Sequence, residues 1–305
     1  MEILVTGGAG FIGSNLAVAL IKEGHNVTVL DNFHSGSEDN LKGLQIRLVK
    51  GTPSEIKKLD IGKPQVIFHE GIYSSTPMYK KNPRLVASVL DDFICLLEFA
   101  KENNSKIVFA ATSSLYNGIK PPHREDVIPG VTDFYTEARI AMERMAELYN
   151  KLYGVRVIGL RYFSVYGPHE EAKGTYANLI SQFLWAILKG ENPVIYGDGT
   201  QTRDFTYIDD VVRANLLAMD SKTSFGIYNV GTGKNYTLNR MVEILNQKLG
   251  TSIKPAYVEN KMQNYVQETL ADTSKAEKEL GFKSQISLEV GIERLIAYTK
   301  IEKVK

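Results

Sequence analysis

The residues best suited to chemistry in this chain are a tyrosine and an arginine four positions apart, Tyr135 and Arg139. They lie in 134–153, where the spacing of apolar residues predicts a long helix, so both side chains share one face. A tyrosine with its ordinary pKa near 10 is a poor base at neutral pH, but a neighbouring guanidinium favours the phenolate. Thr112 follows the predicted strand 107–110, where its hydroxyl can bind the same alcohol. The three side chains predict proton transfer to and from a substrate hydroxyl.

A glycine-rich turn near the N-terminus gives this pair its context. Gly7 permits a sharp turn out of the first strand, and Gly10 lets a pyrophosphate approach the backbone. Gly13 lets the following helix pack closely on the strand. The N-terminus of that helix offers free N–H groups and a helix dipole that favour phosphate oxygens, and we assign Phe11 and Ile12 of the turn to cofactor binding. The turn therefore predicts a dinucleotide-binding strand–helix–strand unit.

An acidic residue at the end of the second strand indicates which dinucleotide binds. Asp31 closes the predicted strand 27–30 and is followed by Asn32. A carboxylate about twenty residues after the turn accepts from both ribose hydroxyls and repels a 2′-phosphate. We therefore expect NAD rather than NADP, with Asn32 beside it.

A tyrosine and an arginine four residues apart, like Tyr135 and Arg139, occur on many ordinary helices. A bound cationic nicotinamide would add to Arg139 in favouring the phenolate of Tyr135.

Strands and helices alternate along the first half of the chain, which is typical of a parallel sheet covered on both faces. After residue 168 the predicted elements become shorter and mixed. We expect an α/β protein: a Rossmann-type, doubly wound parallel sheet over 1–168, with a return of the chain over roughly 203–228, and a smaller mixed α/β lobe over 169–305 that binds the second ligand. The expected strands are 2–6, 27–30, 46–49, 66–69, 107–110 and 155–160, and the expected helices are 54–59, 83–102, 134–153, 176–188, 208–219, 238–249, 274–280 and 288–301. Brief strand-like pieces are expected at 194–195, 203–207 and 227–230, and a polar loop at 71–77.

Composition limits the cellular compartment and the classes of partner that we expect for this protein. The chain has 36 Lys and Arg against 35 Asp and Glu, a net charge of +1, which gives no support to a nucleic-acid or acidic-membrane partner. The single cysteine, Cys95, cannot form an internal disulfide and fits a reducing compartment. Met1 nearly abuts the first strand, and no apolar run reaches membrane-spanning length, so we expect a cytoplasmic protein. We expect no metal. His34 is interpreted as a solvated loop histidine, and the other four histidines lack metal-binding spacing: His25, His69, His123 and His169.

Further motifs occur along nearly the whole chain. They are Tyr116 four residues after Thr112, then Arg161-Tyr162-Phe163, Gly197-Asp198-Gly199, Arg203-Asp204-Phe205, Asn229-Val230-Gly231, and Ala271-Asp272 through Gly281. With the glycine turn, Asp31-Asn32, Thr112 and Tyr135, the sequence resembles the extended short-chain dehydrogenase/reductases. Within them it resembles the nucleotide-sugar 4-epimerases of the UDP-glucose 4-epimerase type.

The resemblance implies a role for each candidate residue. Tyr135, as phenolate, takes the proton from the sugar 4-hydroxyl while the hydride at C4 passes to NAD. Thr112 orients that hydroxyl and shares the proton. The resulting 4-keto sugar turns over about its pyrophosphate linkage and receives the hydride on its other face, so NAD is regenerated and retained.

The resemblance also implies contacts to the nucleotide of a UDP-sugar. Asn178 lies near the nucleotide, Tyr196 lines the base, and Arg203 pairs with the pyrophosphate, for which a fork-shaped cation is suited. A homodimer through the helices 83–102 and 134–153 is implied as well.

Several positions depart from the family pattern. The usual lysine after the tyrosine is Arg139, which keeps the positive charge and belongs to both the catalytic and the cofactor-binding set. The usual asparagine after Arg-Tyr-Phe is Ser164, and the usual aspartate at the adenine is Thr52. A second basic clamp on the diphosphate is lost or is taken over by Lys261, in the stretch 261–265. We assign Ser164 and Lys261 to substrate binding.

Local features narrow the reaction. Related dehydratases carry an Asp-Glu pair after the threonine and uronate decarboxylases a glutamate, whereas this chain has Ser113-Ser114, which cannot do that acid–base work. Asp31 argues against the NADPH-dependent reductases. Thr269 falls where the epimerases gate N-acetyl sugars, and its small size predicts tolerance for N-acetylhexosamine as well as hexose.

Three interpretations follow. The leading one is an NAD-dependent 4-epimerase of UDP-glucose and UDP-galactose. A second keeps the chemistry but changes the sugar, for instance to a uronate. A third is a dinucleotide-binding regulatory protein without turnover.

Overall fold

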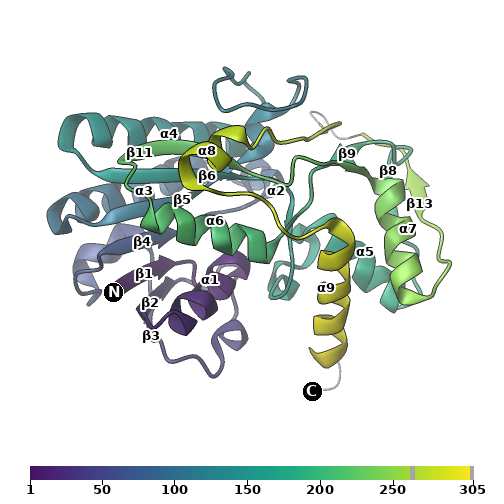
Figure 1. Cartoon of the computed structure of the whole chain (residues 1–305), viewed down its shortest axis with the longest axis horizontal. Coiled ribbons are helices and arrows are strands. Elements are labelled where there is room, and N and C mark those ends of the chain that lie inside the picture. The colour runs from purple at the N-terminus through teal and green to yellow at the C-terminus, as the bar shows by residue number, and fades with distance from the viewer. Residues whose placement is uncertain (262–264, 303–305) are drawn as a thin grey trace.

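The centre of the molecule is a seven-stranded parallel sheet, seen in a computed structural model that describes residues 1–261 and 265–302 (Figure 1). All neighbouring strands run parallel, which confirms the predicted α/β fold with a doubly wound sheet. The strand order from edge to edge is β11 (Phe225–Val230), β6 (Arg156–Tyr162), β5 (Lys106–Thr112), β4 (Val66–His69), β1 (Glu2–Thr6), β2 (Asn26–Asp31) and β3 (Arg47–Lys50).

Helices cover both faces of this sheet (Figure 1). On one face lie α1 (Phe11–Lys22) and α6 (Ile208–Asp220), and on the other α3 (Leu85–Asn103) and α4 (Phe134–Tyr153). The central strands β4 and β5 are buried along their whole length, as expected for strands covered on both sides.

The helix α4 begins and ends at residues suited to those positions. Asp133 accepts a hydrogen bond from the backbone N–H of Thr136 and so caps the helix start. Gly154 adopts a left-handed conformation at the other end, which glycine does without steric cost. These signals fix where Tyr135 falls, one residue into the helix.

The strand order reverses between β1 and β4. Thr6 and His69 are paired neighbours at the carboxyl ends of these two strands. In open α/β sheets, ligands bind beyond the carboxyl ends of the strands at such a reversal. The glycine turn, which follows Thr6, therefore stands at the position where this sheet binds ligands.

The second part of the chain forms a smaller lobe beside the sheet (Figure 1). It contains the helices α5 (Leu179–Leu188), α7 (Leu238–Leu249) and α9 (Leu288–Glu302), and short strand pairs: β7 (Val165–Tyr166) with β10 (Thr206–Tyr207), β8 (Val194–Tyr196) with β13 (Ala256–Val258), and β9 (Thr202–Arg203) with β12 (Tyr236–Thr237). The chain returns to the main sheet with α6 and β11, and α8 (Ser274–Leu280) packs against both.

Most predicted elements agree with the structure to within a few residues. The short helix expected over 54–59 is a 3-10 helix, Pro53–Lys58, and three further stretches differ. The stretch 71–77 is not a loop throughout, because a short helix, α2 (Thr76–Lys81), begins inside it with Pro77 in its first turn, a position that proline favours. The helix expected over 176–188 begins only at Leu179. The single strand expected over 203–207 is two strands, β9 and β10, that pair with different partners.

Short 3-10 turns occur at Glu38–Leu41, Pro53–Lys58, Ser113–Tyr116 and Glu171–Tyr176. Across 1–261 and 265–302, no helix combines the length and apolar character needed to cross a bilayer. In the same ranges there is no group of three His, Cys, Asp or Glu side chains placed to hold a metal ion.

Candidate active site

The tyrosine and threonine singled out by the sequence meet in the structure. The hydroxyl of Tyr135 donates a hydrogen bond of 3.0 Å to Oγ1 of Thr112. Thr112 is the last residue of β5 and Tyr135 the second of α4, so a strand end and a helix start bring them together. Oγ1 of Thr112 also accepts from the backbone N–H of Ser114, which holds its rotamer. The pair can present two hydroxyl oxygens to one substrate alcohol.

Arg139 lies against the same tyrosine. Its side chain is only 3% exposed, and its Cζ lies 5.1 Å from the centre of the Tyr135 ring. Its Nη2 donates to the backbone carbonyl of Tyr73 at 2.8 Å. The guanidinium therefore places a buried positive charge beside the tyrosine ring and bonds the loop after β4.

The glycine turn forms a cradle with no room for side chains. A Cβ on Gly13 would overlap the carbonyl oxygen of Gly7, and one on Gly10 would lie 3.1 Å from that same oxygen. Gly7 itself has a φ of +68°, in the left-handed region. The turn lines a cavity together with the other residues predicted to bind the cofactor: Phe11, Ile12, Asp31 and Asn32.

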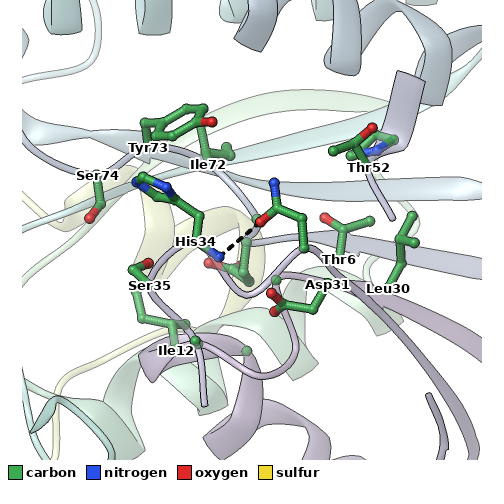
Figure 2. A pocket seen from close by; sticks show the side chains of 18 of the residues that line it. Thr6, Ile12, Leu30, Asp31, His34, Ser35, Thr52, Ile72, Tyr73 and Ser74 are labelled. Atoms are coloured by element: carbon green, nitrogen blue, oxygen red, sulfur yellow. Dashed lines mark hydrogen bonds between the residues drawn. The ribbon is translucent and has the colours of Figure 1, made fainter. Parts of the chain in front are cut away.

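Asp31 lines the same cavity, and two backbone N–H groups hold its carboxyl group in place (Figure 2). Its Oδ2 accepts from the N–H of Ala9 at 2.9 Å, and its Oδ1 accepts from the N–H of Phe33 at 2.7 Å. Burial raises the pKa of Asp31, and the two backbone hydrogen bonds act in the opposite direction. A glycine cradle with an oriented carboxyl group beyond it suits the pyrophosphate and ribose of NAD.

A second cavity, of about 290 Å³, adjoins the first and contains the three residues predicted to carry the reaction; we call it the reaction cavity. Thr112, Tyr135 and Arg139 line it. So do the other predicted substrate-binding residues Ser164, Asn178, Arg203 and Thr269. The structure therefore brings side chains from the sheet and from the smaller lobe to one cavity.

The guanidinium of Arg203 is engaged within the protein. Its Nη2 donates to the carbonyl of Val266, and its Nη1 donates to those of Thr202 and Gln267. Burial lowers the pKa of Arg203, and the aromatic ring of Tyr265 lies 5.5 Å from its Cζ. Its role on a diphosphate stays a prediction.

Two predicted substrate residues lie elsewhere. Tyr196, in β8, is 44% exposed and does not belong to the lining of either cavity. Lys261 pairs with Glu259 at 3.2 Å, and its side chain is 79% exposed. Residues 262–264 of the expected second clamp lie outside the described residues. Nothing in this geometry brings Tyr196 or Lys261 to the reaction residues.

Comparison with known proteins decides the family. Residues 3–231 match the model of the NAD dependent epimerase/dehydratase family. The chain belongs to this family. NAD is accordingly its cofactor, and the predicted preference for NAD and the resemblance to the extended short-chain enzymes are confirmed.

Members of the family share most of this chain. A putative UDP-glucose 4-epimerase of Methanocaldococcus jannaschii is 34% identical over 98% of this chain and 98% of its own. The structure of UDP-glucose 4-epimerase from Thermotoga maritima with UDP-glucose is similar with a TM-score of 0.93, at 32% identity over the whole of both chains. UDP-glucuronic acid 4-epimerase from Bacillus cereus, solved with UDP-glucuronic acid and NAD, gives a TM-score of 0.88 at 27% identity over 99% and 100% of the chains.

Some residues that line both cavities were not predicted from the sequence. Two of them carry ionisable groups, Glu70 after β4 and Lys173 in the 3-10 turn before α5. A signal for Glu70 was present, because a polar residue directly after a buried parallel strand falls at the ligand edge of the sheet. Lys173 gave no such signal, since its turn belongs to no regular pattern.

Proposed function

We propose that this protein is an NAD-dependent 4-epimerase that interconverts UDP-glucose and UDP-galactose. The observation that carries the proposal is the hydrogen-bonded pair Tyr135–Thr112, at the wall of a cavity that adjoins the dinucleotide cavity. The similar proteins from M. jannaschii and T. maritima, named as UDP-glucose 4-epimerases, support the choice of sugar.

In this mechanism the side chains of the protein bind the sugar hydroxyl and transfer its proton. Bound NAD supplies a hydride acceptor that later acts as donor. Tyr135, as phenolate, removes the proton of the sugar 4-hydroxyl, and Thr112 Oγ1 holds that hydroxyl by a hydrogen bond. Arg139 places its positive charge beside this tyrosine, with its Cζ 5.1 Å from the ring centre. When the hydride returns to the other face of C4, Tyr135 gives the proton back, so the chain ends the cycle unchanged.

The residues after Thr112 favour epimerisation over elimination or decarboxylation. Ser113 and Ser114 carry no carboxyl group, and proton transfer at C5 or C6 needs one. Ser114 is instead bonded to Thr112, whose hydroxyl donates to Ser114 Oγ at 3.1 Å. A chain without a second acid–base pair at this position suits a reaction confined to C4.

The nucleotide contacts form the second part of the proposal. We assign Asn178, Ser164 and Arg203 to the UDP moiety because all three line the reaction cavity. Tyr196 and Lys261 would have to approach from the surface, and we keep them as the base and diphosphate contacts that the resemblance implies.

Thr269 supports a wider range of sugars. It lines the reaction cavity, and its Oγ1 accepts from the backbone N–H of Asp204 at 3.0 Å. A small side chain held in this way leaves room for an acetamido group. We therefore expect turnover of UDP-N-acetylglucosamine as well as UDP-glucose. An assay that finds only the second would remove this part of the proposal.

One experiment separates the three interpretations. Nucleotide released from the purified protein is identified, and conversion of UDP-galactose is then followed for wild type and Tyr135→Phe. We expect released NAD, and turnover that falls by about 10²-fold or more in the variant. A wild type that is no faster than the variant with UDP-galactose and also fails to convert UDP-glucuronic acid would leave the regulatory interpretation.

A uronate is the second candidate substrate, because the similar B. cereus protein is a UDP-glucuronic acid 4-epimerase. The same assay with UDP-glucuronic acid decides between them. A higher kcat/KM for the uronate than for UDP-galactose would replace our choice of sugar and keep the C4 chemistry.

We further propose that two copies pair through α3 and α4. On α4, Leu148, Leu152 and Tyr153 are large apolar side chains that are substantially exposed. Leu148 and Leu152 share one face of the helix. Light scattering should give a dimer for wild type and a monomer for Leu152→Asp, and a monomeric wild type at all concentrations would refute this pairing.

A further inference from the structure

The carboxyl group of Glu70 stands at the reversal of the strand order. Glu70 follows β4, and its backbone N–H donates to the carbonyl of Thr6 in β1 at 3.1 Å. The glycine turn packs directly on this peptide, because a Cβ on Gly7 would lie 2.8 Å from the carbonyl carbon of Glu70 and would overlap Gly71. The position of Glu70 is therefore fixed against the dinucleotide cradle.

Glu70 also belongs to both cavities. It lines the dinucleotide cavity together with Asp31 and the reaction cavity together with Tyr135. A dinucleotide whose adenosine end lies at Asp31 and whose reactive end lies at Tyr135 must pass the residues common to both cavities. Glu70 would then border the nicotinamide half of a dinucleotide bound in this way.

The two oxygens of this carboxyl group differ. Oε1 accepts from the hydroxyl of Tyr162 at 2.8 Å, and that hydroxyl accepts in turn from Nδ2 of Asn215 at 2.9 Å. Oε2 is buried and has no hydrogen-bond partner among the residues that the structure describes. One oxygen is tied to β6, and the other is left for a group that the protein does not supply.

Burial also affects whether the carboxyl group of Glu70 carries a proton. It raises the pKa of Glu70 to about 8, against smaller opposing effects of Tyr162 and Arg139, so the carboxyl group is neutral at pH 7. Because Oε1 accepts from Tyr162, the proton belongs on Oε2. An O–H donor that is buried without an acceptor is unfavourable, and an acceptor on a bound ligand removes this penalty.

We propose that Glu70 is a cofactor-binding residue whose protonated carboxyl group donates a hydrogen bond from Oε2 to an oxygen on the nicotinamide half of NAD. The neutral form of the Glu70 carboxyl group is needed for two reasons. Only the neutral acid has a proton to donate, and only the neutral acid avoids repulsion from the diphosphate of the dinucleotide.

Charged and titratable groups approach Glu70 from several elements. His69 precedes it on β4, and burial lowers the pKa of His69 to about 3, so this imidazole is neutral. Arg139 faces it from α4 and Tyr162 from β6. Lys173, which lines the same two cavities, is paired with Glu170 at 3.3 Å. NAD binding should therefore weaken as Glu70 ionises above about pH 8.

The test measures the Kd of NAD for protein stripped of nucleotide, by titration calorimetry at pH 7 and pH 9.5. No sugar is present, so the result is independent of the proposed epimerisation. For wild type we expect a Kd about tenfold larger at pH 9.5, since Glu70 is then mostly ionised. Glu70→Gln keeps a donor that does not ionise in this range, and its Kd should change less than twofold. Glu70→Leu, which keeps the volume but not the donor, should bind about tenfold more weakly at pH 7.

Two outcomes would overturn the proposal: a pH dependence in Glu70→Gln equal to that of wild type, or a Kd that does not change between pH 7 and 9.5 in wild type. Circular dichroism at both pH values confirms that each protein is folded. The comparison of wild type with Glu70→Gln decides the matter even where Glu70→Leu does not fold.

Discussion

Arg139 donates a hydrogen bond of 2.8 Å from its Nη2 to the backbone carbonyl of Tyr73, and this bond joins the two cavities of the molecule. Arg139 belongs to the reaction cavity and Tyr73 to the dinucleotide cavity, where its ring meets that of His34 at 4.3 Å (Figure 2). The hydroxyl of Tyr79 donates to the same carbonyl at 3.1 Å. The residue that replaces the family's lysine thus supports the loop that faces the cofactor.

Two substitutions of Arg139 should separate the effect of its positive charge from the effect of the hydrogen bond that its guanidinium donates to Tyr73. Arg139→Lys keeps the charge beside Tyr135 and should retain kcat to within about tenfold. Arg139→Met removes both the charge and the bond to Tyr73, and kcat should fall by about 10²-fold or more. Steady-state kinetics on protein with measured NAD content checks this, and wild-type kcat in Arg139→Met would show that the charge is dispensable.

Removal of the Thr112 hydroxyl should slow turnover without loss of cofactor. Thr112→Val has nearly the same shape but cannot bond the substrate alcohol or Tyr135, so kcat should fall by about tenfold or more, the effect of one hydrogen bond. Thr112→Ser keeps the hydroxyl and serves as the control. Equal rates for the valine and serine variants would mean that this hydroxyl takes no part.

Loss of the Asp31 charge should weaken discrimination between NAD and NADP. In Asp31→Asn the Kd of NAD should rise by about tenfold, because hydrogen bonds to a charged acceptor are lost, and the Kd of NADP should rise less. Asp39 carries an exposed carboxylate in the 3-10 turn Glu38–Leu41, so Asp39→Asn is the matched control. An unchanged ratio of the two Kd values in Asp31→Asn would contradict the assigned role.

A buried ion pair positions the helix that carries Tyr135. Glu143 on α4 accepts two hydrogen bonds from Arg161 on β6, at 2.8 and 2.7 Å. Glu143→Ala would leave the guanidinium buried and unpaired, so the free energy of unfolding should fall by about 3–5 kcal/mol. Glu147→Ala, which removes partly exposed ion pairs with Lys151 and Arg144 from the same helix, should change it by no more than about 1 kcal/mol. Urea unfolding of both variants measures the difference, and equal effects would refute the role of burial.

Stability should depend on His69 in acid. Burial, with a smaller contribution from Arg139, lowers the pKa of His69 to about 3, whereas an unfolded histidine titrates near 6.5. The unfolded chain then binds the extra proton, so the free energy of unfolding falls as pH drops from about 6.5 towards 3. His69→Asn, which can still bond Thr6, should show a shallower loss between pH 7 and 4 in urea midpoints. Parallel curves for the two proteins would exclude this titration.

Much of the site followed from short-range patterns. The spacing of Gly7, Gly10 and Gly13 and the acid at the end of β2 are properties of a contiguous unit, in which backbone geometry alone fixes what can bind. Tyr135 and Arg139 share a face because the helix period does not depend on the rest of the chain. The capping residues Asp133 and Gly154 likewise act within a few residues.

Other features were decided only by the fold. Burial raises the pKa of Glu70, and the partner of its Oε1 is Tyr162, which is 92 positions away in sequence. Local sequence specifies neither the dielectric around a side chain nor so distant a partner. The exposure of Tyr196 and Lys261 depends on how the smaller lobe lies on the sheet. The sequence by itself determined the cofactor cradle and the reactive pair, because helix period and turn geometry are local. The tertiary structure decided which buried groups are ionised and which predicted residues reach the cavity, because desolvation and proximity arise only when distant segments pack.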